Sequence, residues 1–176
     1  MKDPRYPIGR FQEPAEYTPE LRERLIQEIE DMPQRLEEAV AGLSEEDLGQ
    51  TYREGGWTIR QVVHHLADAN VNAYVRFKLA ATEDNPPVKP FEEAEWAELE
   101  DGAHEDVSVS LALVSALNRR WATFLRSLDT EAFSRTYNHP VDGKTSLDKA
   151  LAFYTWHGRH HIAQITNWRE NYKKAA

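Results

Sequence analysis

The sequence contains no cysteine, which excludes disulfide bonds, thiolate metal ligands and cysteine nucleophiles together. It also contains no apolar run approaching the roughly 18 residues that a bilayer-spanning helix needs. The first nine residues are polar and include two prolines, unlike a secretory signal peptide. From these absences we expect a cytoplasmic protein that does not associate with membranes.

Basic residues are outnumbered, with 21 Lys and Arg against 30 Asp and Glu and a formal net charge of -9. A surface of this sign repels phosphate backbones, so we expect no nucleic-acid partner. Hydrophobic residues make up 40% of the chain, which is enough to build a buried core. The length then predicts one domain spanning residues 1–176.

Strand patterns are almost absent, and apolar residues instead recur at helical spacing in four segments. The first segment begins at Thr18, a capping hydroxyl, with Pro19 at the first helical position. The second begins at Thr58, where Gln61 completes a capping box, and is expected to run to about Thr82.

The third helix is expected to begin after a cap at Ser108 or Ser110. The fourth is expected to begin after a cap at Thr145 or Ser146 and to extend to about Tyr172. Four long helices with little else predict an all-α protein, a four-helix bundle.

Three further stretches are rich in turn-forming residues. Residues 1–17 hold three prolines among apolar side chains, which predicts an extended arm that packs on the chain's own body or on a partner subunit. Residues 83–107 are expected to form a long crossover loop with a short helix around 92–99, whose Trp96 faces inward. Residues 129–145 are expected to be irregular, with a hairpin-like excursion.

The histidines are the most informative residues, because five of them fall on the second and fourth helices. His157 and His161 are four residues apart and therefore share one helical face. A helical wheel places His161 near the middle of the apolar sector, His157 at its edge, and His160 toward solvent. On the second helix, spacing favours His65 over His64 only slightly. The seven histidines are His64, His65, His104, His139, His157, His160 and His161.

Imidazole binds zinc, nickel, copper or iron, and three histidines leave one position of a tetrahedral zinc site open. That open position is typical of a catalytic site. The H-E-x-x-H metalloprotease motif is absent, since Gly158 follows His157, and the paired Glu-x-x-His motifs of di-iron bundles are absent too. A fourth ligand such as His139 would close the site and favour a non-catalytic metal-binding or stress-response bundle instead. A pure interaction module would bind no metal.

Water attack usually needs a general base, yet no carboxylate adjoins the histidine pair of the fourth helix. Asp68 and Glu54 are candidate bases, although both also fit surface or capping roles. Asn72 and Gln164 are candidates for holding the ligand imidazoles in place.

Arginines and tryptophans could contact a substrate, but surface and core roles are the commoner ones. The arginines that could bind a substrate carboxylate are Arg60, Arg76 and Arg119 or Arg120. The tryptophans, expected to lie in the core, are Trp57, Trp121 and Trp156.

Taken together, these segments resemble the YfiT-like branch of the DinB superfamily, whose members are described as metal-dependent hydrolases and as bacillithiol-type thiol transferases. The likeness covers nearly the whole chain, and the combination of motifs is far more specific than any one of them. It is strongest in YPIG (6–9), YREGGWTIRQVVHHLAD (52–68), NAYVRFKL (72–79), NRRWATFLRSL (118–128) and YTWHGRHHIAQI (154–165).

The resemblance implies a homodimeric four-helix bundle with one divalent metal per chain, zinc first and nickel or another transition metal as alternatives. Its ligands would be the second histidine of VVHHLAD, His65, together with His157 and His161. The implied activity is a metal-dependent hydrolase or thiol S-transferase that activates water or a low-molecular-weight thiol for attack on a small electrophilic substrate. Because no carboxylate adjoins the histidine pair as a general base, thiol transfer is slightly favoured over hydrolysis. Relatives can carry more histidines where Gly158 and Arg159 stand here, which puts any auxiliary role of Arg159 in doubt.

Overall fold

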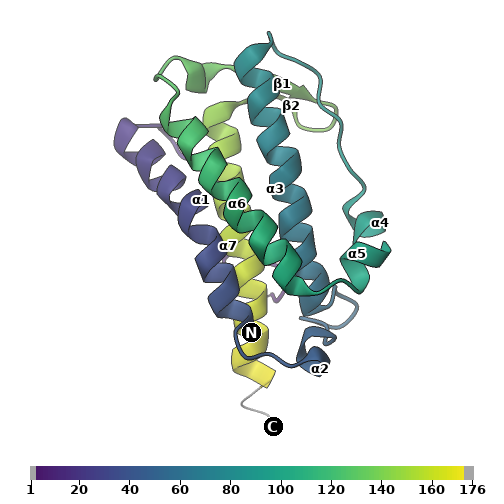
Figure 1. The fold of residues 1–176 in the computed structure, drawn as a ribbon. Coiled ribbons are helices and arrows are strands. Elements are labelled where there is room, and N and C mark those ends of the chain that lie inside the picture. Colours follow the sequence, from purple (N-terminus) through teal and green to yellow (C-terminus); the bar gives the residue numbers. More distant parts are fainter. Residues whose placement is uncertain (1–2, 173–176) are drawn as a thin grey trace.

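The computed structural model describes residues 3–172 and consists mainly of four long helices (Figure 1). These are α1 (Pro19–Val40), α3 (Ile59–Thr82), α6 (Val107–Arg126) and α7 (Leu147–Tyr172). Shorter elements connect them: α2 (Glu45–Leu48), α4 (Glu93–Ala97), α5 (Glu100–Ala103), η1 (Ala132–Ser134), β1 (Thr136–His139) and β2 (Gly143–Ser146). The predicted all-α bundle is confirmed.

The long helices run in two parallel pairs, α1 with α7 and α3 with α6, the second pair antiparallel to the first (Figure 1). Helix α1 packs on α6 and α7, and α3 packs on the same two helices. Because α3 and α6 run in the same direction, the chain must return along the bundle between them. Residues 83–106 make this return, which confirms the predicted crossover.

The helix starts follow local capping chemistry. The Thr18 hydroxyl accepts from Leu21 N at the start of α1, and Thr58 and Gln61 form the predicted capping box of α3. The predicted serine cap of α6 is wrong. Asp106 caps this helix instead, with its carboxylate accepting from the backbone N–H of Ser108 at 2.7 Å. A carboxylate at this position also interacts favourably with the helix dipole.

Helix α7 begins after Ser146, whose hydroxyl accepts a hydrogen bond from Lys149 N at 3.2 Å. Ser146 is therefore the cap, one of the two that were predicted. Immediately before it, β1 and β2 pair antiparallel in the register Thr136↔Ser146, and confirm the expected hairpin. Val88 N donates to Asn138 O at 3.0 Å, which fastens the crossover to this hairpin.

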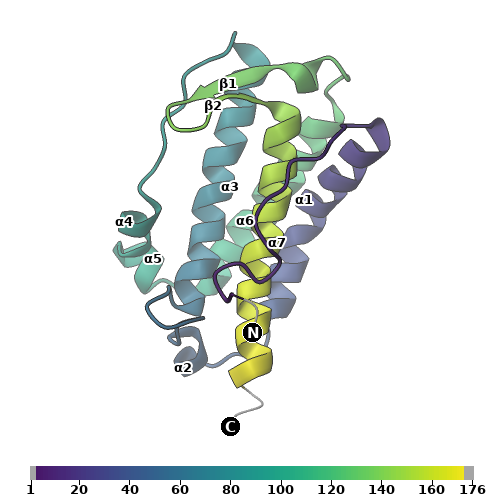
Figure 2. The same ribbon diagram turned by 180° about the vertical axis from the view of Figure 1, so that it is seen from behind.

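The N-terminal arm lies along α7 on the back of the bundle (Figure 2). Phe11 contacts Phe153 edge-on, with ring centroids 5.4 Å apart, and lies 5.9 Å from the ring of Trp156. The arm therefore packs on its own chain, one of the two predicted alternatives. Its first two residues, Met1 and Lys2, lie outside the described residues.

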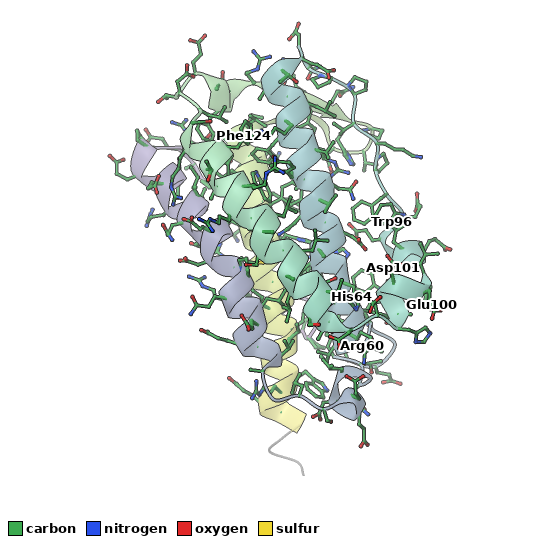
Figure 3. All side chains as sticks on the ribbon, in the orientation of Figure 1. Arg60, His64, Trp96, Glu100, Asp101 and Phe124 are labelled. Atoms are coloured by element: carbon green, nitrogen blue, oxygen red, sulfur yellow. The ribbon has the colours of Figure 1, made fainter. Side chains whose placement is uncertain are left out.

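Two clusters of buried apolar side chains fill the bundle, one toward each end. Trp121 and Phe77 lie in the first cluster with ring centroids 5.2 Å apart. The prediction that Trp96 faces inward is wrong, since it is 38% exposed and lies at α4 beside the crossover (Figure 3). Its ring packs on Phe91, in the crossover itself. Among the described residues, none of the helices combines the length and apolar character that crossing a bilayer requires.

Candidate metal centre

The structure brings together three histidines from two helices. Helix α3 supplies His65 and α7 supplies His157 and His161, because α3 and α7 pack side by side. The Nε2 atom of His157 lies 3.3 Å from Nε2 of His65 and 3.1 Å from Nε2 of His161. Within the described residues, these three are the group of histidines or acids whose ligand atoms could share one metal ion.

The spacing of these nitrogens suits a small cation. Zinc–nitrogen bonds of about 2.0–2.1 Å at tetrahedral angles place two nitrogens roughly 3.3 Å apart. Both Nε2 separations lie close to that value. The residues present therefore fit a metal of zinc's size and geometry, with one coordination position left for another ligand.

The environment keeps the three imidazoles neutral, which is the form that binds metals. Burial is the main cause that lowers the pKa of His65 to about 2, with smaller contributions from the neighbouring His161 and His160. Burial likewise holds the pKa values of His157 and His161 well below their ordinary value, with their histidine neighbours adding to the effect. At neutral pH each ring can offer a nitrogen lone pair.

Gln164 orients one of the three rings, as the sequence predicted. Its amide oxygen accepts from Nδ1 of His161 at 2.8 Å, which leaves the Nε2 lone pair facing the centre. Asn72 does not play the equivalent role that was predicted for it. Its amide donates to the carbonyl of Asp68, 2.9 Å away and one turn back along α3.

His160 is buried, with 6% of its surface exposed, so its predicted solvent position is wrong. The wheel treated the side of α7 away from the bundle as free, but the N-terminal arm covers it. The ring lies between Trp156, 4.8 Å away, and Tyr6 of the arm, 5.8 Å away. The Gln164 amide donates to His160 Nε2 at 3.1 Å and to the carbonyl of Arg5 at 3.2 Å, linking the arm to the histidine group.

The two adjacent histidines of α3 have different surroundings, which resolves the choice that spacing left open. His64 faces the start of α6 (Figure 3). Its Nδ1 lies 2.7 Å from the Ser110 hydroxyl and its Nε2 lies 2.9 Å from the carbonyl of Glu105. Both nitrogens are occupied, so His64 ties α3 to α6, and His65 alone joins the histidines of α7.

A cavity of about 690 Å³ opens beside the three histidines, and His157 and His161 line it. Its walls come from α3, α7, the crossover, the hairpin, the 49–57 loop and the arm. Aromatic side chains form much of its lining: Tyr6, Phe11, Tyr52, Trp57, Phe91, Tyr137, Phe153, Tyr154 and Trp156. Of the three tryptophans expected in the core, Trp121 alone is fully buried, while Trp57 and Trp156 line the cavity.

Neither predicted base lines this cavity, whose acidic residues are Glu93 and Asp142. His139, considered as a fourth ligand, also lines it, but its Nδ1 lies 3.1 Å from the Asp142 carboxylate and it is not part of the histidine group. The described residues thus supply no fourth histidine or acid to the group. Glu54 is exposed and Asp68 is half-buried, and neither of them lines the cavity.

The structure separates the candidate arginines. Arg60 pairs with Glu45 and donates to the carbonyl of Glu105, and so joins surface segments. Arg119 and Arg120 lie around a different, shallower depression. Arg76 alone of the four lines the cavity. On a helical wheel it shares the edge of the apolar stripe with His65, eleven residues earlier, but this position alone did not distinguish it from the other arginines.

These features define a class of protein, a four-helix bundle with three converging histidines at a cavity. The family model described as the DinB superfamily matches residues 9–165, and the chain belongs to this superfamily. YfiT from Bacillus subtilis, described as a probable metal-dependent hydrolase with an unusual four-helix bundle topology, superposes with a TM-score of 0.94. The two sequences are 42% identical, and the match covers 97% of this chain and 98% of YfiT.

Relatives in other Bacillus species are more similar in sequence. A protein of Bacillus mycoides strain KBAB4 and another of Bacillus cereus strain 03BB102 are each 49% identical over 170 residues. Each match covers 97% of this chain and 98% of the relative. Both relatives are provisionally named metal-dependent hydrolases, which agrees with a histidine group able to bind a metal.

Proposed function

We propose that this protein is a metal-dependent enzyme whose His65, His157 and His161 together hold one divalent cation, zinc. The observation that carries the proposal is the convergence of three neutral, buried imidazoles on one point beside a cavity. Three protein ligands leave a position for a reactant, whereas structural zinc sites usually have four. A bound cation of this kind lowers the pKa of water or of a thiol that occupies the open position.

Hydrolysis is the reaction class named for the relatives, and the cavity size suits a small organic substrate. The aromatic lining of the cavity would hold the apolar part of that substrate and exclude bulk water. Glu93 and Asp142 are the acids available in the cavity to accept a proton from an attacking water.

Transfer of a low-molecular-weight thiol is the second candidate. It is favoured by the absence, in the described part of the chain, of a carboxylate within the histidine group. A thiol bound as the thiolate needs no separate base, whereas water attack usually does. The electrophile would be an epoxide or an activated carbon. Assembly as a homodimer stays a prediction.

Elemental analysis of the untagged protein, loaded separately with zinc and nickel, tests the metal centre. We expect one metal per chain in the native protein and in His64→Ala, and its loss in His161→Ala. Failure to bind metal under every loading condition would overturn the proposal.

The reaction is then tested with the zinc protein, an activated ester, and an epoxide with and without a small thiol. Ester cleavage that is lost in His161→Ala supports hydrolysis. Consumption of thiol and epoxide in equal amounts, also lost in that variant, supports thiol transfer. Equal rates for the native protein and the variant in every assay would contradict both reactions.

A further inference from the structure

The cavity is basic although the protein is acidic. Four basic side chains line it against two acidic ones, while the whole chain carries a formal charge of -9. A recess whose charge opposes that of the surrounding surface concentrates ligands of the opposite sign. The basic residues are Arg5, Arg53, Arg76 and Lys149.

Two of these basic residues already have carboxylate partners. Arg5 pairs with Asp3 at 2.9 Å, and Lys149 pairs with Glu13 at 3.0 Å. Arg53 and Arg76 form no ion pair with any carboxylate of residues 3–171.

Arg76 is the more unusual of the two, because it is buried, with 9% of its surface exposed. Its Nη1 donates to the Tyr154 hydroxyl at 2.7 Å and its Nη2 donates to the carbonyl of Lys89 at 3.0 Å. Both acceptors are uncharged, and Nε has no hydrogen-bond partner. Burying a guanidinium without a counter-charge is costly, so a buried arginine is usually paired with an anion.

The groups around Arg76 do not form an ion pair with it. Burial raises the pKa of Tyr154 and Arg76 opposes the rise, so the phenol stays protonated at neutral pH. Glu93 lines the same cavity without forming an ion pair with Arg76, and partial burial raises its pKa despite the arginine's charge. The other acid in the cavity, Asp142, contacts His139.

The position of Arg76 relates it to the histidine group. It lies eleven residues after His65 on α3, about 16 Å along the helix axis, and helical side chains lean back toward the N-terminus. Its partner Tyr154 lies three residues before His157 on α7, with ring centroids 6.4 Å apart. A small molecule in the cavity can therefore contact the guanidinium with one end and approach the histidines with the other.

We propose that Arg76 forms a subsite for a carboxylate group of the substrate, set apart from the reacting atom. The proposal rests on the proposed function in one respect, that the histidine end of the cavity is where the reaction occurs. A carboxylate is the anion assigned, because its two oxygens match the N–H groups that remain on the planar guanidinium. The substrate class is then a small electrophile, or a small thiol, that carries a carboxylate.

The test uses the full-length protein labelled with ¹⁵N-arginine and titrated with succinate, in zinc-loaded and chelator-treated forms. We expect succinate to shift one Nε–Hε resonance that is missing from the spectrum of Arg76→Lys, in both forms. The dissociation constant for succinate should rise at least tenfold in Arg76→Lys and stay unchanged in Arg120→Lys, which alters an arginine outside the cavity. Inorganic phosphate should bind more weakly than succinate.

Several outcomes would overturn this subsite. They are the absence of succinate binding, equal affinity in Arg76→Lys, binding that requires zinc, or phosphate binding as tight as that of succinate. If Arg76→Lys fails to fold, Glu93→Gln provides the second test. Removing this repelling charge should tighten succinate binding several-fold, and unchanged or weaker binding would contradict the proposal. A failed metal centre would appear separately, as a protein without metal in which the Arg76 resonance still shifts.

Discussion

The Nδ1 atom of His161 lies 2.8 Å from the amide oxygen of Gln164, three residues further along α7. An amide oxygen can only accept a hydrogen bond, so the proton of this imidazole resides on Nδ1. The Nε2 lone pair then faces His157, at the point where the metal is proposed to bind. Gln164 in turn donates to His160 and to the carbonyl of Arg5, which keeps its oxygen directed at His161.

Replacing Gln164 with leucine should weaken zinc binding by about 10–100-fold, because the ligand ring loses the acceptor that orients it. Gln164→Glu should retain most of the affinity, since a carboxylate accepts the same hydrogen bond. Competition with a chromophoric chelator measures both constants. Asn167→Leu, an exposed change on the same helix, is the control. Equal affinity of the leucine variant and the native protein would show that Gln164 does not position the ligand.

Replacing each of the two adjacent histidines of α3 with alanine should affect metal binding differently. His65→Ala should lose the bound metal. His64→Ala should keep it while lowering the free energy of unfolding by about 1–3 kcal/mol, because Ser110 and Glu105 lose a buried partner. Metal analysis and urea unfolding of the two variants check this. Loss of metal from His64→Ala with retention in His65→Ala would reverse the assignment.

Asp68 provides a pH-dependent prediction. Burial, helped by the charge of Asp101, raises its pKa from an ordinary 3.8 to about 6. As the pH falls, the Asp68 carboxylate therefore binds a proton at a higher pH in the folded protein than in the unfolded chain. Above about pH 6 the buried charge lowers the free energy of unfolding, and this loss of stability disappears as the pH falls toward 4. Asp68→Asn should be more stable than the native protein at pH 7.5 by about 1 kcal/mol, after allowance for solvent screening.

Urea unfolding of the two proteins at pH 7.5 and pH 4 measures this difference, which should nearly vanish at the lower pH. Because Asp68 does not line the cavity, the variant should keep its metal. A gain in stability that is equal at both pH values would mean that the ionisation of Asp68 is not its cause.

Gly158 marks a close approach of α7 to α1, and a Cβ added there would lie 3.2 Å from Cγ of Met32. Gly158→Ala should be nearly neutral, since a gain of up to about 1 kcal/mol in helix propensity offsets a small shift of Met32. Gly158→Glu, which would create an H-E-x-x-H motif, should cost more than about 2 kcal/mol by burying a carboxylate against apolar groups. The melting temperatures of the two Gly158 variants are measured by thermal unfolding, with the exposed change Arg159→Glu as the comparison. Equal melting temperatures for the two glutamate variants would contradict this account.

Much of the bundle could be predicted because its causes are local. Thr58 and Gln61 cap α3 through contacts three residues apart, and the apolar stripes of the long helices repeat at the helical period. The pairing of His157 with His161 is local in the same sense, since residues four apart share a helical face. Asp106 was missed as the cap of α6 because three candidate caps lie within five residues, and local pattern does not rank them.

The other errors concern residues whose surroundings come from distant parts of the chain. His160 was placed toward solvent because a wheel describes one helix and cannot include an arm more than 140 residues earlier. Trp96 was placed inward because a large apolar side chain usually finds a core, but here it lies on a connection outside the bundle. The choice of Arg76 among the arginines likewise depended on which segments surround each side chain.

The sequence by itself determined the long helices, the caps of α1 and α3 and the i, i+4 histidine pair, because each depends on neighbours a few residues away. It also excluded disulfides and thiolate ligands from the chain's own residues, since it contains no cysteine. Helical spacing left open which histidine of α3 joins that pair; the resemblance implied His65, and the tertiary structure shows His65 beside the pair and His64 turned to α6. Only the tertiary structure decided that the arm covers His160. It also decided that Arg76 is buried in the cavity without a counter-charge. The physical reason is that burial and the meeting of side chains from different helices depend on packing, which residues far apart in the sequence establish together.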